Sequence, residues 1–262
     1  MRRHILGCLV TTSLLTLGLA APAAAASSID YVAMGDSYSS GVGAPGQTGL
    51  CLQSPNGYPG LWAARNQPRS FTNLTCGGAE TGDVLDLQVP FVSSGADLIS
   101  ITIGGNDAGF APTVLSCQVS SDAACAQTVA DAEADIGATL PAELDATYAA
   151  IKKKAPSARI VVLGYPLLFD TSSSTCGITG MSLAKRKSLN HGAQVLDDLI
   201  KARVAAAGLT FSDVRDEFAG HGICASAPYL NGLTVLPPQN SFHPTSTGYL
   251  KGYLPAFSGA TG

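Results

Sequence analysis

Charged side chains are scarce in this chain of 262 residues, at 13% of the total against about 25% in an average soluble protein. Acidic residues outnumber basic ones, 19 to 15, and the sequence has no stripe of Lys and Arg that could neutralise a phosphate backbone. We therefore expect no nucleic-acid partner. Hydrophobic residues make up 46% of the chain, which excludes an intrinsically disordered protein, because disorder requires high charge and little apolar content.

Patterns typical of metal sites are also lacking. The seven cysteines include no CxxC pair, and the four histidines, at 4, 191, 221 and 243, lie far apart in the sequence. Zinc sites usually bring such ligands together at short, characteristic spacings. The sequence therefore indicates no metal site.

Hydrophobic runs long enough to span a membrane are missing as well. The N-terminal residues 1–26 have the three parts of a secretory signal peptide: a basic start (residues 2–4), an apolar run (5–19) and small residues before a cleavage site (24–26). The alternative is a membrane anchor, but the apolar run is shorter than the ~20 residues of a spanning helix. We expect a mature chain of residues 27–262 that is secreted, extracellular and without a transmembrane anchor.

Six cysteines remain once Cys8 is removed with the leader. An even number in an exported chain favours disulfides. Six cysteines allow fifteen pairings, and the sequence does not choose among them. Our working hypothesis pairs neighbours: Cys51–Cys76, Cys117–Cys125 and Cys176–Cys224.

Short apolar runs alternate with helical patterns along the chain. The predicted strands are 29–34, 71–75, 97–103, 159–163 and 209–214, and the predicted helices are 122–154 (broken near Gly137 or Pro141), 182–207 and 244–253. Strands that alternate with helices are typical of a parallel sheet covered on both faces. No linker or repeat interrupts residues 27–262, so we expect a single α/β domain.

The residues that suggest chemistry follow the ends of predicted strands, where ligands bind in open parallel sheets. Acyl transfer needs a hydroxyl nucleophile, a base with a pKa near neutrality and donors for an oxyanion. Ser37, in the turn after the first strand, is the candidate nucleophile, and His243 is the candidate base. The candidate oxyanion donors are the backbone N–H groups of Ser37 and Gly78 and the side-chain amide of Asn106.

Each of these residues alone has an ordinary structural interpretation, because Gly-Asp-Ser and Gly-Gly-Asn-Asp are common turns and most histidines pack or face solvent. The ordered set favours catalysis. Other marked residues are expected to be structural: Asp107 as the cap of the next turn, Asp83 as a helix cap, and His191 and His221 as helix-surface and loop residues.

Taken together, Gly-Asp-Ser at 35–37, Gly78, Gly-Gly-Asn-Asp at 104–107 and His243 in Phe-His-Pro-Thr resemble the SGNH hydrolases, also called GDSL esterases and lipases. The secreted bacterial GDSL lipases and phospholipases A1, which carry three disulfides, are the most similar members. The resemblance implies a three-layer α/β/α, flavodoxin-like domain with a five-stranded parallel sheet in the order 2-1-3-4-5. It also implies an acyl-enzyme on Ser37, His243 as base, and no cofactor.

The sequence departs from the family at the residue three before the histidine. Many members have an aspartate there, which orients the ring, whereas this chain has Asn240. Some secreted relatives use the backbone carbonyl two residues before the histidine, which is that of Ser241 here. We therefore expect a Ser37–His243 dyad oriented by the Ser241 carbonyl, with Asp36 or Asp216 as the alternative orienting group.

Apolar side chains cluster in the loops after the strands: Leu50, Leu52, Phe110, Leu167, Leu168, Phe169, Leu230, Leu233, Val235, Leu236 and Phe242. They are either ordinary loop packing or a groove for acyl chains. We favour a monomeric lipase or phospholipase A1 that binds a lipid or ester substrate and contacts a lipid surface transiently. The alternatives are a short-chain or carbohydrate acetylesterase and a non-catalytic α/β binding protein. The last gives no reason for the four site residues to occur together.

Overall fold

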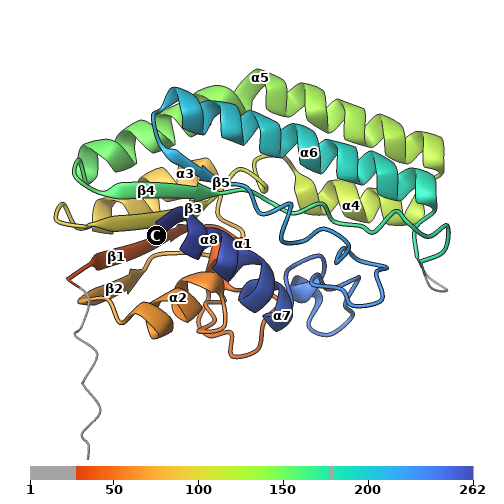
Figure 1. The fold of residues 1–262 in the computed structure, drawn as a ribbon. Helices are drawn as coiled ribbons and strands as arrows, with labels where there is room; N and C mark the ends of the chain where they lie inside the picture. The colour runs from red at the N-terminus through yellow and green to blue at the C-terminus, as the bar shows by residue number, and fades with distance from the viewer. Residues whose placement is uncertain (1–27, 177–179, 262) are drawn as a thin grey trace, which may run out of the picture.

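A five-stranded sheet forms the centre of the computed structural model, which describes residues 28–176 and 180–261 (Figure 1). Its strands are β1 (Asp30–Gly35), β2 (Ser70–Asn73), β3 (Leu98–Thr102), β4 (Arg159–Leu163) and β5 (Thr210–Ser212). All neighbouring pairs are parallel, in the order β2-β1-β3-β4-β5. The predicted fold class and strand order are confirmed, whereas the predicted leader lies outside the described residues.

The central strands are buried on both faces, as in a doubly covered parallel sheet. All five residues of β3 are buried, and β1 is buried from its second residue onward. β1 and β3 pair in register from Tyr31 opposite Leu98 to Gly35 opposite Thr102. The chain therefore leaves both strands at the same edge of the sheet, and the residues that follow them become neighbours.

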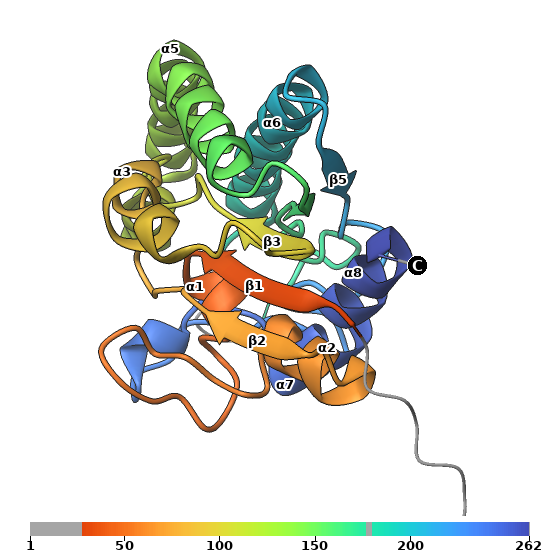
Figure 2. The same cartoon turned by 90° about the vertical axis from the view of Figure 1, so that its left-hand side faces the viewer.

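Helices cover the sheet in two layers (Figure 2). The long helices α5 (Asp122–Lys154) and α6 (Leu183–Ala206) pack together on one face, with α3 (Thr81–Asp83) beside them, and α2 (Tyr58–Asn66) and α8 (Leu254–Thr261) pack on the other. Shorter helical segments are α1 (Ser37–Ser40), η1 (Val84–Gln88), η2 (Val89–Phe91), α4 (Phe110–Val119), η3 (Pro238–Asn240), α7 (Ser246–Gly248) and η4 (Tyr249–Tyr253).

Two helix predictions were wrong. α5 continues without a break through Gly137 and Pro141. Proline removes one helix hydrogen bond, but Leu140 and Leu144 beside it are fully buried, and α5 packs along α6, so tertiary contacts hold the helix together. The last helical region does not end at 253, because η4 continues directly into α8 and buries further apolar residues there.

Aromatic side chains fasten the C-terminal segment, η4 and α8, to α2 and to the sheet. Tyr58 stacks on Tyr253, with ring centroids 5.4 Å apart, and Phe257 packs against Tyr31 of β1. The buried Tyr253 hydroxyl donates to the carbonyl of Gly164, directly after β4, at 2.9 Å. The C-terminal segment thereby closes over the sheet and brings the preceding loop, with His243, to the edge where the strands end.

The described residues contain three disulfides: Cys51–Cys76, Cys117–Cys125 and Cys176–Cys224. Each joins cysteines that are neighbours in sequence order. Across residues 28–176 and 180–261, no helix combines the length and the hydropathy that crossing a membrane requires.

Candidate active site

Ser37 sits in a sharp turn between β1 and α1. Gly35 has a φ of 108°, and a Cβ atom there would lie 2.2 Å from the carbonyl oxygen of Thr102, so only glycine fits this position. Asp36 is the N-cap of α1, and its carboxylate accepts a hydrogen bond from the Tyr38 N–H at 2.9 Å. Ser37 is therefore the first residue of the helix, where backbone N–H groups have no partner within the helix.

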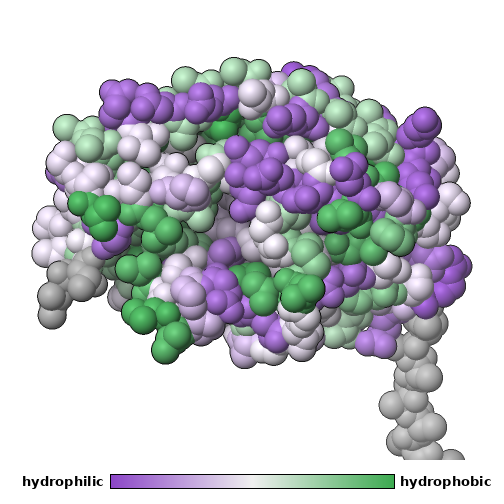
Figure 3. Space-filling view, turned by 180° about the vertical axis from the view of Figure 1, so that it is seen from behind, coloured by the Kyte–Doolittle hydropathy of each residue, from purple (hydrophilic) through white to green (hydrophobic). Residues whose placement is uncertain are grey.

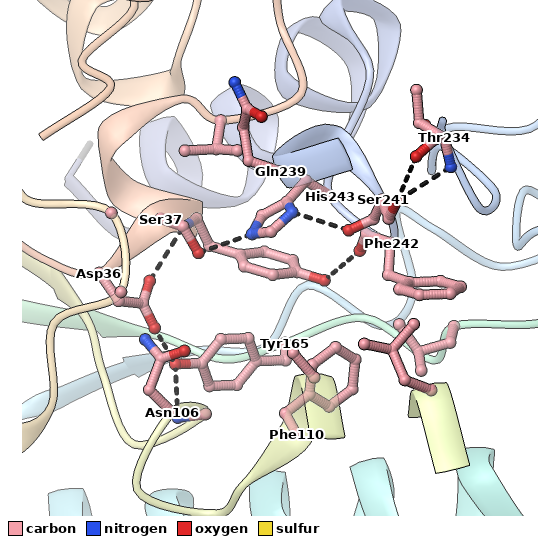
Figure 4. A pocket seen from close by; sticks show the side chains of 18 of the residues that line it. Asp36, Ser37, Asn106, Phe110, Tyr165, Thr234, Gln239, Ser241, Phe242 and His243 are labelled. Atoms are coloured by element: carbon pink, nitrogen blue, oxygen red, sulfur yellow. Dashed lines mark hydrogen bonds between the residues drawn. The ribbon is translucent and has the colours of Figure 1, made fainter. Parts of the chain in front are cut away.

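His243 reaches Ser37 across 206 residues of sequence (Figure 4). Its Nε2 lies 2.7 Å from Ser37 Oγ, and its Nδ1 lies 2.9 Å from the carbonyl oxygen of Ser241. A carbonyl can only accept, so Nδ1 carries the proton and Nε2 is free to accept one from Ser37. Burial lowers the pKa of His243 to about 4, which keeps the imidazole neutral near pH 7.

The loop that carries His243 is held by residues that the sequence did not single out. Asn231 donates to the His243 carbonyl oxygen from its backbone N–H at 2.8 Å and from its side-chain amide at 3.0 Å. The buried Tyr38 hydroxyl donates to the carbonyl of Phe242 at 2.7 Å. Phe242 itself has a φ of 64°, a conformation that these contacts hold in place.

The candidate oxyanion donors line the same cavity as Ser37 and His243. Gly78 has a φ of 84°, and the space beside its Cα is open. Asn106 donates one amide hydrogen to the carbonyl of Ala79 at 2.9 Å. An amide nitrogen carries two hydrogens, so this contact fixes the side chain and leaves a second donor. The structure thus brings together all four residues singled out for acyl transfer.

Asp36 does not orient His243. Its second carboxylate oxygen accepts a hydrogen bond from the Tyr165 hydroxyl, which in turn accepts one from the Gly105 N–H at 3.0 Å. The Nδ1 atom of His243 faces Ser241 instead. Asp216, the other alternative, does not line the cavity. Burial raises the pKa of Asp36 to about 7.

Sequence reasoning missed Tyr165. A usable signal was present, because Tyr165 follows β4 and therefore belongs to the same edge of the sheet as the other site residues. Its backbone N–H donates to the buried carboxylate of Asp197 at 2.8 Å. Tyr165 thus links the loop after β4 to the turn that carries Ser37 (Figure 4).

Asp107 caps a different element from the one predicted. The Asp107 carboxylate accepts hydrogen bonds from the backbone N–H of Thr81 at 3.0 Å and from the Thr81 hydroxyl at 2.6 Å. Asp107 therefore caps the start of α3 and not the turn that follows Asp107 itself. The reason is tertiary: the loop after β3 faces the start of α3. Asp83 caps α3 as expected, by accepting from the Glu80 N–H. His191 is exposed on α6, and His221 stacks on Tyr229 in a loop.

The cavity beside Ser37 measures about 300 Å³ and is mainly apolar. Five of the predicted apolar loop residues line it: Leu52, Phe110, Leu168, Leu233 and Phe242. Others belong elsewhere, since Phe169 and Leu230 are buried in the core, whereas Leu50, Val235 and Leu236 are exposed. Leu115 of α4 and Leu196 of α6 also line the cavity, and neither was among the apolar residues predicted to do so.

Known proteins resemble the chain over almost its whole length. Residues 33–251 match the GDSL-like Lipase/Acylhydrolase family. A lipase of Streptomyces rimosus is 46% identical over 258 residues, which cover 97% of this chain and 95% of that protein.

Two solved structures share the fold closely. The extracellular lipase of Streptomyces rimosus superposes with a TM-score of 0.84 at 47% identity, covering 88% of this chain and 99% of that one. The phospholipase A1 of Streptomyces albidoflavus NA297 superposes with a TM-score of 0.85 at 42% identity, covering 88% and 98%. With the fold, the strand-end motifs and the match over residues 33–251 in agreement, the chain belongs to the GDSL-like lipase/acylhydrolase family.

Proposed function

We propose that the chain is a serine hydrolase that cleaves carboxylic ester bonds of lipids, as a lipase or phospholipase A1. The observation that carries this proposal is the 2.7 Å contact between Ser37 Oγ and His243 Nε2 at the wall of an apolar cavity. Similar proteins are named lipase and phospholipase A1, which supports a lipid ester as substrate.

In the first half of the reaction, Ser37 Oγ attacks the ester carbonyl while its proton moves to His243 Nε2. The carbonyl oxygen becomes an oxyanion, which the N–H groups of Ser37 and Gly78 and the amide of Asn106 stabilise. His243 then gives its proton to the leaving alcohol oxygen. The ester C–O bond breaks, and the acyl group stays on Ser37.

In the second half, a water molecule attacks the acyl-enzyme and His243 takes its proton. The tetrahedral intermediate collapses, the bond to Ser37 Oγ breaks, and Oγ recovers a proton from His243. The products are a carboxylic acid and free enzyme. Throughout, the Ser241 carbonyl holds the ring through Nδ1–H and so fixes its tautomer and direction.

The proposal includes a secretory leader at residues 1–26 and an extracellular, monomeric mature domain of residues 27–262. The three disulfides support export, because such bonds persist in oxidising compartments. A relative of known structure is an extracellular lipase, which supports the same conclusion.

Hydrolysis of p-nitrophenyl esters over a series of acyl lengths tests the function, with Ser37→Ala as control. We expect turnover with an optimum at medium or long chains, reduced by several orders of magnitude in Ser37→Ala. An optimum at acetate would indicate a short-chain or carbohydrate acetylesterase. Absence of turnover with every ester, phospholipids included, would indicate a non-catalytic protein.

A further inference from the structure

Three segments around the catalytic cavity contain no Asp, Glu, Lys or Arg. They are residues 37–64, 108–121 and 218–250. Each contributes to the cavity wall, through Leu52, Leu115 and Leu233 respectively. Charged residues make up 13% of the whole chain, so uncharged segments of this length are unusual, although residues 4–29 and 171–184 also form uncharged runs.

Seven large, exposed hydrophobic side chains occupy the same three segments. Of the seven, Leu250 lies in η4, and we call the other six the apolar rim: Leu50, Leu115, Val119, Leu233, Val235 and Leu236. Their exposed fractions run from 49% for Leu115 to 100% for Leu50. Figure 3 shows hydrophobic side chains at its left-hand side, which corresponds to the right-hand side of Figure 1, toward which the strands of the sheet run. Monomeric soluble proteins rarely leave large contiguous apolar patches in water unless the patch binds something.

The apolar rim is continuous with the cavity. Leu115 and Leu233 belong to both, and Val119 lies one turn further along α4 than Leu115. Leu50 lies in the loop closed by backbone hydrogen bonds between Thr48 and Gln53, and the same loop contributes Leu52 to the cavity.

A side-chain contact joins two of the rim segments. The Gln47 amide donates to the Asn240 side-chain oxygen at 2.7 Å, so the loop that carries Leu50 is bound to the loop that follows Leu236. A charged group does lie at the border of the rim, where the Lys185 ammonium donates to the carbonyl of Ser120, next to Val119.

We propose that the apolar rim docks the enzyme on an electrically neutral lipid surface, such as a bilayer of zwitterionic phosphatidylcholine. The proposal rests on the proposed lipid-ester function and specifies the surface on which that function operates. Docking there places the cavity mouth against the lipid layer, so an acyl chain passes from one apolar environment to another without crossing water.

The absence of charge selects this partner. Binding to anionic lipids normally uses clusters of Lys and Arg, each worth about 1 kcal/mol near the membrane surface. The three rim segments contain none, and the chain as a whole carries a net charge of −4. Attraction to the lipid must therefore come from burial of apolar area, which salt does not screen.

A pair of matched double variants tests the proposal. Val235→Ser/Leu236→Ser removes two rim side chains that do not line the cavity. Leu87→Ser/Phe91→Ser removes two hydrophobic side chains that are 65% and 68% exposed in η1 and η2, outside the rim segments. Vesicle binding is measured by co-sedimentation with phosphatidylcholine vesicles in a Ser37→Ala background, so that the lipid is not consumed. Hydrolysis of dissolved p-nitrophenyl butyrate is measured in the active background.

We expect the rim variant to bind vesicles at least about tenfold more weakly, while it hydrolyses the dissolved ester within about twofold of the parent rate. The control variant should match the parent in both assays. Binding of the parent should change little between low and high salt and should gain nothing from added anionic lipid.

Three results would overturn the docking proposal. The rim variant and the control variant could bind vesicles equally well. Binding could require anionic lipid and disappear in high salt. Light scattering could show a dimer that the rim substitutions dissociate, in which case the rim is an interface between copies of this chain. Failure of the parent enzyme to hydrolyse any ester, dissolved or in vesicles, would instead refute the proposed function.

Discussion

Burial shifts the pKa values of His243 and Asp36, which both lie beside Ser37, in opposite directions. It lowers the pKa of His243 to about 4, because the charged imidazolium loses its water, and it raises the pKa of Asp36 to about 7, because the carboxylate does. The neutral form is favoured in both residues. The nucleophile therefore lies in a weakly charged environment. The imidazole of His243 stays unprotonated, and so available to accept the Ser37 proton, over a wide range of pH.

The acid limit of activity should reflect the lowered pKa of His243. Protonated His243 cannot accept the Ser37 proton, so kcat/KM should fall as the pH drops toward about 4 and not near 6.5, the value of a solvated histidine. The measurement is kcat/KM for a dissolved ester from pH 3.5 to 8, with the fold checked by circular dichroism. A midpoint near 6.5 would show that the ring is hydrated in solution.

The orientation of His243 should depend on a backbone atom. Ser241→Ala keeps the carbonyl that faces Nδ1, and Asn240→Ala removes only the contact with Gln47, so both variants should keep kcat within about tenfold. His243→Ala should reduce kcat by several orders of magnitude. If replacing an existing Asp or Glu residue removed activity as completely as His243→Ala does, that carboxylate would be the group that orients His243.

At the scale of elements, the turn between β1 and α1 depends on glycine at position 35. Gly35→Ala would place a methyl group against the Thr102 carbonyl in a backbone conformation that costs about 1–3 kcal/mol for other residues. We expect a marked fall in Tm together with loss of esterase activity. Gly82→Ala is the matched control, because it lies in α3 with nothing within 4 Å, and its Tm should be unchanged or higher. If Gly35→Ala had the same Tm as the parent, the turn between β1 and α1 could rearrange to accept a side chain.

The Cys51–Cys76 disulfide fastens the loop that carries Leu50 and Leu52 to the segment just before Gly78. The double change Cys51→Ser/Cys76→Ser should reduce the free energy of unfolding by about 2–4 kcal/mol and also raise KM, because the cavity wall loosens. The control, Cys117→Ser/Cys125→Ser, removes the bridge from α4 to α5. Its cysteines are 8 residues apart in sequence, against 25 for Cys51 and Cys76, so it closes a shorter loop and its loss should reduce the free energy of unfolding by less. An unchanged KM in the first variant would show that other contacts hold the loop.

For the whole molecule, the raised pKa of Asp36 links folding to pH. An unfolded aspartate titrates near 3.8 and the folded one near 7, so the folded state holds its proton more tightly. The resulting stability is fully present below pH 3.8 and is lost as the pH rises through 7. His243 opposes this trend, because its lowered pKa reduces stability as the pH falls from 6.5 toward 4.

Comparison with Asp36→Asn isolates the aspartate contribution, since His243 is common to both proteins. The Tm of the parent should fall relative to that of Asp36→Asn as the pH rises from 4 to 8. Parallel Tm curves would show that Asp36 titrates in the folded protein as it does in the unfolded chain.

The sequence alone determined the fold class and the residues of the dyad. Both depend on local signals: apolar runs of strand length, helical periodicity, and glycine-rich turns directly after strands. Because parallel strands end at one edge of a sheet, residues as distant as Ser37 and Asn106 could be assigned to one site before their contacts were known. The strand order and the role of the Ser241 carbonyl came from the family resemblance.

Only the tertiary structure decided which groups meet and how deeply each is buried. It joined Asp107 to Thr81 and Asp36 to Tyr165, and it kept α5 continuous through Pro141 by packing the helix along α6. It also lowered the pKa of His243, 206 residues away from its partner Ser37. The physical reason is that helix and strand patterns are set by neighbours in sequence, whereas hydrogen-bond partners, desolvation and packing are set by atoms that folding brings together.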